Sequence, residues 1–167
     1  GTNGTSLAMR ASTWSSMRVC TPPSVHGEAC SYGLSGRERY PVNCVSQIQA
    51  QTYCSWTSRR LPTEKEWELA ATAPGGSPFV WGSGEPPGEL CWRRDQGSCA
   101  TASRGGDKTA GGIYDLAANL REWVSEPGVT RGGTWHDTDL AQLGVRTRSL
   151  VVATERLSDL GFRCARD

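Results

Sequence analysis

The alternation of apolar and polar positions predicts two helices in the first half of the chain. Ser46 is placed to cap a helix that runs to about Ser58, and Gln49, three residues after the cap, completes a capping box. The apolar positions within this segment give the helix one buried side. That side is expected to include Ile48, Tyr53 and Trp56.

A second helix is predicted in the stretch LPTEKEWELAATA. Thr63 and Glu66 form another capping box, and Glu64 lies where a negative charge interacts favourably with the helix dipole. The side that faces the core is expected to include Trp67, Ala70 and Ala71.

The second half of the chain reads as strands and ordered loops. Residues 75–112 are rich in Gly, Pro, Ser and charge, but FVWG and CWRRDQGSC interrupt them, and their tryptophans and cysteines favour an ordered loop over a linker. A chain of 167 residues is large enough for one hydrophobic core. We therefore expect a single domain over residues 1–167.

Charge and hydropathy narrow the classes of partner. The chain has 18 Lys plus Arg against 17 Asp plus Glu, a formal charge of +1. So small an excess gives no field that would attract nucleic acid or an anionic membrane surface, and no apolar run is long enough for a membrane helix. We expect no nucleic-acid partner and no membrane insertion.

The cysteines indicate an oxidising compartment. Seven cysteines are dense for a cytosolic protein of this size, only two histidines could help them to bind zinc, and no C-x-x-C motif occurs. We therefore expect disulfides and an extracytoplasmic location, whether periplasmic, cell-surface or secreted. The odd count leaves one cysteine free, paired to another molecule, or paired to a segment outside this sequence.

Six ordered blocks carry a resemblance to a known family: PVNCVSQIQAQTYCSW, RRLPTEKEWELAA, FVWG, GIYDLAANLREWVSE, VTRGGTW and LGFRCARD. They resemble the formylglycine-generating enzyme, or sulfatase-modifying factor, family over residues 40–167. The resemblance implies an α+β fold similar to C-type lectins, with two helices, a small twisted antiparallel sheet and extensive irregular loops. Family domains usually begin with a strand pair, so this domain is expected to be shortened at its N-terminus.

The resemblance also bears on copper. Catalytic members carry two cysteines after the Arg-Gly-Gly-Ser-Trp signature, and these thiolates hold the copper that oxidises a substrate cysteine. In RGGTWHDTDLAQ their positions fall on Asp137 and Gln142. A carboxylate and a carboxamide are poor ligands for Cu(I), which requires soft donors. No copper is expected, and we interpret the chain as a pseudoenzyme.

The resemblance implies a disulfide between Cys54 and Cys164. A short disulfide loop is also expected from Cys91 to Cys99, and the pairing of Cys20, Cys30 and Cys44 stays open.

The resemblance also implies one calcium ion, because the block YDLAANLREW matches a family calcium site. Its ligands would be the side chain of Asp115, the carbonyls of Ala118 and Leu120, and Glu122.

The calcium assignment has an alternative and two departures from the family pattern. The alternative is a capped turn in which Glu122 forms an ion pair. The family prefers glycine at Ala118 and tryptophan at Arg121, and an alanine resists backbone conformations that glycine adopts freely.

The histidines do not complete a catalytic site. A related branch of the family uses non-haem iron, but His26 and His136 lack a second histidine or a facial carboxylate at suitable spacing, so no iron is expected. His136, next to the carboxylate of Asp137, is a candidate general base, but no nucleophile can be assigned beside it. We favour a surface histidine in a polar loop.

The arginines have two interpretations. One is a cleft for an acidic ligand, and the other, which we favour, is a set of ion pairs and hydrogen bonds to loop carbonyls. The residues concerned are Arg131, Arg146, Arg148 and Arg163.

The favoured function is a non-catalytic binding or structural module for a protein, small-molecule or glycan ligand. Its binding face would be a polar segment on a rigid frame. The residues are His136, Asp137, Thr138, Asp139 and Gln142. The alternatives are a diverged formylglycine-generating-type oxidoreductase and a sensor or assembly subunit, homo- or hetero-oligomeric, docked through its N-terminal edge.

Overall fold

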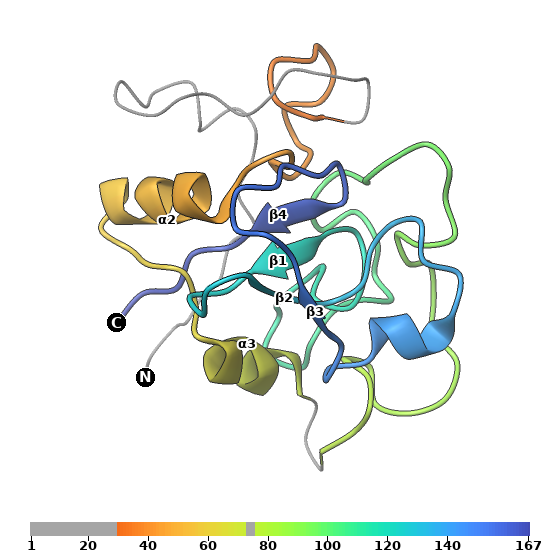
Figure 1. Ribbon diagram of the computed structural model, residues 1–167. Coiled ribbons are helices and arrows are strands. Elements are labelled where there is room, and N and C mark those ends of the chain that lie inside the picture. Colours follow the sequence, from red (N-terminus) through yellow and green to blue (C-terminus); the bar gives the residue numbers. More distant parts are fainter. Residues whose placement is uncertain (1–29, 73–75) are drawn as a thin grey trace.

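The computed structural model describes residues 30–72 and 76–167. In this part of the chain, two helices and a 3-10 turn accompany a four-stranded sheet of order β3-β2-β1-β4 (Figure 1). The elements are α2 (Gln47–Trp56), α3 (Glu64–Ala71), β1 (Arg121–Trp123), β2 (Val129–Arg131), η1 (Leu140–Leu143), β3 (Arg148–Leu150) and β4 (Leu160–Phe162). The expectations for Cys20, His26 and the N-terminal edge concern residues 1–29 and lie outside the described residues.

Helix α2 starts at the predicted cap but turns a different face inward. Ser46 and Gln49 form the reciprocal capping box. Tyr53 is buried as predicted, whereas Ile48 and Trp56 are 68% and 48% exposed, so the prediction was wrong for these two. Gln47 takes the inner position instead, because its side-chain amide donates to the carbonyls of Val124 and Glu126, each at 2.7 Å.

Helix α3 follows its prediction closely. Thr63 caps it, and Glu66 completes the box. Trp67 and Ala71 are buried, and Ala70 is partly buried against the same cluster. The buried side of this short helix is therefore set mainly by one tryptophan.

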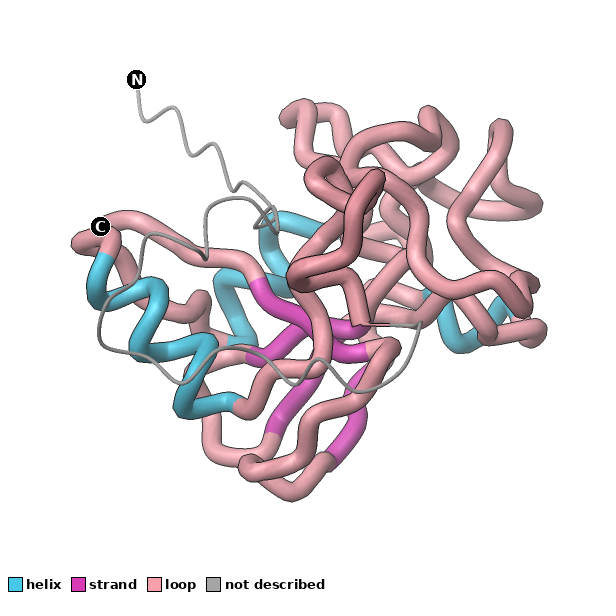
Figure 2. Tube along the Cα trace, turned by 90° about the horizontal axis from the view of Figure 1, so that it is seen from above, coloured by secondary structure: helices cyan, strands magenta, loops and turns pink. Residues whose placement is uncertain are grey.

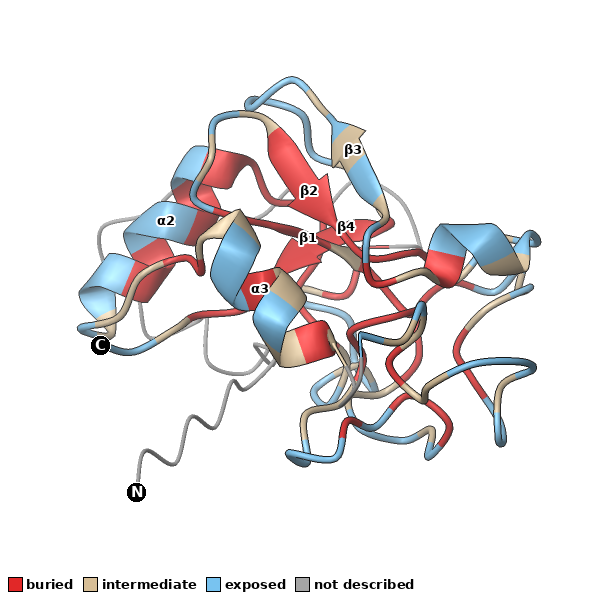
Figure 3. Cartoon of the chain, turned by 90° about the horizontal axis from the view of Figure 1, so that it is seen from below, coloured by how far each residue is buried: buried red, intermediate tan, exposed pale blue. Residues whose placement is uncertain are grey.

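The sheet separates two clusters of apolar side chains. Figure 1 shows α2 to the left of β4 and α3 below the strands. Trp123, Phe162 and Tyr53 belong to the cluster under α2, whereas Val124, directly after Trp123, belongs to the cluster at α3. Neighbouring residues alternate between faces, as an extended chain requires. Figure 3 shows buried residues concentrated in β1, β2 and β4.

The α+β class and the two helices are confirmed, but the sheet is mixed and not wholly antiparallel. β1 pairs antiparallel with β2, and β2 with β3, whereas β1 and β4 run parallel. Strands of three residues carry no sequence signal for their direction, so the parallel pair was not predictable from the pattern. Loops make up most of the remaining chain, as Figure 2 shows.

Three disulfides link the loops to this frame. Cys54–Cys164 and Cys91–Cys99 are confirmed, and Cys30–Cys44 resolves part of the pairing that the sequence left open. Together they indicate an oxidising, extracytoplasmic environment. In the described part of the chain, no helix is long and apolar enough to cross a membrane.

The Cys54–Cys164 bridge should stabilise the fold more than the Cys91–Cys99 bridge. The two bridges join residues 110 and 8 positions apart, and loop-closure entropy rises with that separation. Replacing Cys54 and Cys164 by alanine should lower the free energy of unfolding by about 4 to 5 kcal/mol, and replacing Cys91 and Cys99 by about 2 to 3 kcal/mol. Urea unfolding measures both variants, and equal losses would contradict the expectation.

Candidate functional site

A buried carboxylate, Asp107, organises the loop that carries the expected calcium ligands. It is 1% exposed. Its two carboxylate oxygens accept hydrogen bonds at 2.9 to 3.2 Å from the successive backbone amides of Leu116, Ala117 and Ala118. Three amides that point the same way thus share one anionic acceptor, and this fixes the turn before β1.

The same loop contains two residues in the left-handed region of backbone space. Asp115 and Asn119 have φ of 59° and 72°, a conformation that Asp and Asn tolerate better than most residues. Asp115 Oδ2 accepts from the amide of Ala102 at 2.7 Å. Asn119 Oδ1 accepts from the amide of Cys99 at 3.0 Å, which ties the loop to the Cys91–Cys99 disulfide. Ala118 has no positive φ in the structure, so its departure from glycine carries no backbone strain.

Glu122 forms a buried ion pair with Arg163. Its Oε2 accepts from Arg163 Nε at 2.5 Å and from Trp67 Nε1 at 2.8 Å, and its Oε1 accepts from Arg163 Nη2 at 2.8 Å. Arg163 Nη2 also donates to the carbonyls of Tyr114 and Asp115, each at 3.1 Å. The ion pair that the sequence left as an alternative for Glu122 is therefore present.

This region buries more acidic than basic side chains. Asp107, Asp115 and Glu122 are all buried, against the single guanidinium of Arg163. Burial raises the pKa of Asp107 to about 7, and burial also raises the pKa of Asp115. Three carboxyl groups thus face one guanidinium, and a cation bound here would favour their ionised forms.

A small cavity lies at the same place. Its volume is about 10 Å³, roughly the space of one water molecule or ion. It is lined by Pro41, Asp115, Asn119, Leu120, Glu122 and Phe162. Within the described residues, no three His, Cys, Asp or Glu side chains are grouped to hold a metal, so an ion here would depend on amide and backbone oxygens beside two carboxylates.

The segment expected to bind a ligand lies on the surface over a fixed support. His136, Thr138, Asp139 and Gln142 are exposed, and Asp137 is half-buried. Arg94 N donates to the carbonyl of Trp135 at 2.9 Å, and Arg93 N donates to that of Asp137 at 3.1 Å. The Cys91–Cys99 loop therefore supports the segment through backbone hydrogen bonds.

Both aspartates in that segment also have local structural roles. Asp137 Oδ2 accepts from the amide of Thr134 at 2.7 Å. Asp139 Oδ1 accepts from the amide of Ala141 at 2.9 Å and caps η1. The carboxylate beside His136 is Asp159, whose Oδ2 lies 3.8 Å from His136 Nε2 and 2.7 Å from Arg121 Nη2.

Three of the four arginines considered from the sequence pair with glutamates. Arg163 pairs with Glu122; Arg131 donates to Glu64 at 3.1 Å and to Glu68 at 2.9 Å, and Arg148 donates to Glu64 at 2.8 Å. The structural interpretation holds for these three. Arg146 makes no ion pair and no side-chain hydrogen bond with another described residue.

Sequence reasoning missed Asp107 and the role of Asn119. The only signal for Asp107 is an isolated acid in the glycine-rich stretch RGGDKTAGG, just before YDLAANLREW. Such a residue looks like an exposed loop acid, because nothing in its neighbours indicates burial. The amides that it binds lie 9 to 11 residues further along the chain.

Comparisons with known proteins agree with this fold. The model of the family described as "Sulfatase-modifying factor enzyme 1-like domain" matches residues 4–167. Inactive C-alpha-formylglycine-generating enzyme 2 of Bos taurus is 31% identical over 160 residues, covering 80% of this chain and 52% of the relative. Formylglycine-generating enzyme of Streptomyces coelicolor is 31% identical over 179 residues, covering 84% of this chain and 57% of the relative. The chain thus spans about half the length of these relatives, which include a protein named as inactive.

Solved structures share the architecture at lower identity. Treponema denticola variable protein 1 has a TM-score of 0.68 at 19% identity and covers 89% of this chain and 76% of its own. PvdO from Pseudomonas aeruginosa has a TM-score of 0.66 at 21% identity and covers 78% of this chain and 63% of its own. At this identity the likeness shows the fold alone.

Asp107→Asn should destabilise the fold even without added metal. An amide presents one acceptor oxygen, so one side of the turn at Ala117 and Ala118 would face an NH₂ group and lose its partner. We expect a loss of about 2 to 4 kcal/mol in the free energy of unfolding, measured with urea in a chelating buffer. Asp95→Asn, at an exposed loop position, is the matched control and should change it by less than about 0.5 kcal/mol. Similar values for the two variants would mean that Asp107 does not hold the turn.

Proposed function

Because the chain belongs to the family of sulfatase-modifying factor enzyme 1-like domains, we propose that it is a non-catalytic binding or structural module. It would keep the family frame without the copper chemistry. The observation that carries this proposal is the state of its cysteines. All six cysteines in the described part of the chain are joined in disulfides, and Asp137 and Gln142 stand where the family's copper-binding thiolates are expected.

The residues at those two positions do not suit copper. Cu(I) favours thiolate and thioether ligands, whereas Asp137 and Gln142 offer oxygen and amide groups. The Asp137 carboxylate is engaged with the amide of Thr134. Gln142 is an exposed residue of η1. No step of copper-dependent oxidation can be assigned to this pair.

The exposed segment from His136 to Gln142 is the proposed binding face. Its backbone is held by the Cys91–Cys99 loop, so its side chains can meet a ligand with little further ordering of the chain. This supports a recognition role at the cell surface, in the periplasm or in the secreted state.

We also propose one calcium ion in the loop before β1. Its ligands would be Asp115, Glu122 and the carbonyls of Ala118 and Leu120. The buried excess of acidic over basic side chains and the small cavity beside Asp115 and Glu122 support this assignment. Glu122 would then serve both the ion and Arg163, and the ion would stabilise the loop without taking part in chemistry.

The copper test compares the chain with a variant that regains thiolates. The chain should leave a cysteine-containing sulfatase peptide unchanged, with or without added copper, because it lacks soft ligands at the site. It should also retain no stoichiometric Cu(I) after gel filtration, while the Asp137→Cys/Gln142→Cys variant should retain more. Mass spectrometry of the peptide and metal analysis of the protein are the measurements. Conversion of the peptide to formylglycine by the unaltered chain would refute the non-catalytic assignment.

The calcium test uses Asp115→Asn, because asparagine keeps an acceptor for the Ala102 amide and tolerates the positive φ of this position, whereas a change at Glu122 would also break its ion pair with Arg163. Excess calcium at about 100 times the dissociation constant should stabilise the unaltered chain by about 2.7 kcal/mol. Asp115→Asn should lose most of this gain, because it removes one of the two charged ligands, while Asp95→Asn should keep it. Thermal unfolding in calcium and in chelator gives both values. An unaltered chain that melts at the same temperature in both buffers binds no stabilising calcium.

A further inference from the structure

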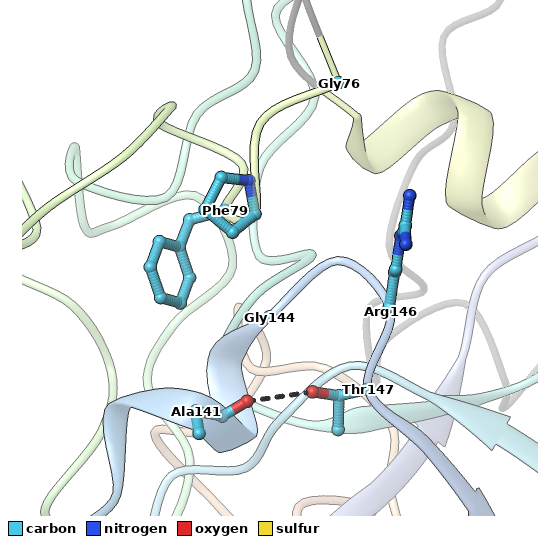
Figure 4. A pocket seen from close by; sticks show the side chains of 7 residues that line it. Gly76, Phe79, Ala141, Gly144, Arg146 and Thr147 are labelled. Carbon is cyan, nitrogen blue, oxygen red and sulfur yellow. Dashed lines mark hydrogen bonds between the residues drawn. The ribbon is translucent and has the colours of Figure 1, made fainter.

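A separate open pocket lies between the loop before Trp81 and the turn after η1 (Figure 4). Its volume is about 600 Å³, within the range of small-molecule sites. The lining residues that matter here are Pro78, Phe79, Ala141, Gly144, Arg146 and Thr147.

Hydrogen bonds fix the two walls of this pocket to each other. Val145 N donates to the carbonyl of Pro78 at 2.9 Å, which joins the turn to the opposite loop. On the turn side, Thr147 Oγ1 donates to the carbonyl of Ala141 at 3.2 Å. A pocket whose walls are already in place loses little conformational entropy when a ligand enters.

The other wall offers an aromatic ring in a fixed orientation. Phe79 stacks on Trp81 with ring centroids 4.8 Å apart and an interplanar angle of 3°. Its backbone pairs with Gly82 in both directions, at 3.1 and 3.0 Å. Phe79 is half-buried, so part of its surface stays accessible to a ligand.

Arg146 supplies the charge. Unlike Arg131, Arg148 and Arg163, it has no carboxylate partner among the described residues, and Figure 4 shows its side chain across the pocket from Phe79. A guanidinium presents paired donors that match the two oxygens of a carboxylate. A doubly charged phosphate is ordinarily held by several donors, and one arginine suits a monoanion better.

We propose that this pocket binds a small aromatic carboxylate. Its acid group would pair with Arg146, and its ring would lie against Pro78 and Phe79. The inference rests on the proposed function, since it gives a ligand class to a binding module. It also places the ligand beside Ala141 of η1, next to the exposed segment His136 to Gln142.

The experiment titrates the isotopically labelled full chain with 3-phenylpropionate and follows backbone amide shifts by NMR. The uncharged 3-phenylpropionamide is the matched probe. Shifts should concentrate at the amides of Gly76, Ser77 and Phe79 and of residues 141–147. The uncharged probe should bind at least about 10-fold more weakly, since a charge-assisted hydrogen bond is lost.

Three variants separate charge from folding. Arg146→Gln should weaken acid binding about 10- to 100-fold, and Arg146→Lys should restore part of it, because lysine keeps the charge without the planar pair of donors. Arg166→Gln removes one exposed positive charge near the C-terminus and should bind like the unaltered chain. Thermal unfolding confirms that each variant is folded.

Several results would overturn the proposal: no binding at millimolar acid, equal binding of acid and amide, shifts elsewhere on the molecule, or an unaffected Arg146→Gln variant. None of these would affect the copper test. A chain that neither oxidises the sulfatase peptide nor binds the acid remains a non-catalytic module with another ligand. A chain that oxidises the peptide is an enzyme, whatever this pocket binds.

Discussion

The buried pair of Glu122 and Arg163 joins the parts of this fold that the short strands cannot hold alone. Glu122 lies on β1, and Arg163 directly follows β4, so the pair reinforces the parallel edge of the sheet. Trp67 brings α3 to the same carboxylate, and Arg163 reaches the carbonyls of Tyr114 and Asp115. A buried charge is tolerated only when it is paired, and removing one partner leaves the other uncompensated. The geometry of helix, sheet and loop is therefore coupled at one point.

Buried polar side chains give the loops the backbone hydrogen bonds that paired strands supply in larger sheets. Backbone amides buried in irregular segments need partners, and a chain with three-residue strands supplies few of them from the sheet. Asp107 satisfies three amides at once. Asn119 exchanges hydrogen bonds with both the amide and the carbonyl of Cys99. The side-chain amide of Gln47, on α2, likewise donates to two carbonyls of the loop after β1. These residues make the loops part of the rigid frame.

This explains which features the sequence predicted and which it did not. The helix caps depend on residues three positions apart, so Ser46 with Gln49 and Thr63 with Glu66 were readable from local order. The Cys54–Cys164 bridge came from the family resemblance. The inward position of Gln47, the burial of Asp107 and the pairing of β1 with β4 depend on partners far along the chain. In the sequence, a polar residue with a distant partner looks like an exposed residue. The inner position on α2 was therefore not assigned to Gln47, and Ile48 and Trp56 were wrongly placed inside.

The position of the core interactions also explains why the side chains that follow Trp135 can change without loss of the fold. The Glu122–Arg163 pair and the hydrogen bond from Trp67 do not involve residues 136 to 142. The two aspartates of this segment make local hydrogen bonds: Asp137 closes a turn on Thr134, and Asp139 caps η1. Asp137, the position at which the family resemblance implies a copper-binding thiolate, can thus serve its own turn. Because the support comes from the Cys91–Cys99 loop behind it, a change of side chains on this surface alters what the protein can bind while leaving the core interactions in place. A change of side-chain chemistry in this segment and retention of the fold are therefore physically compatible in this chain.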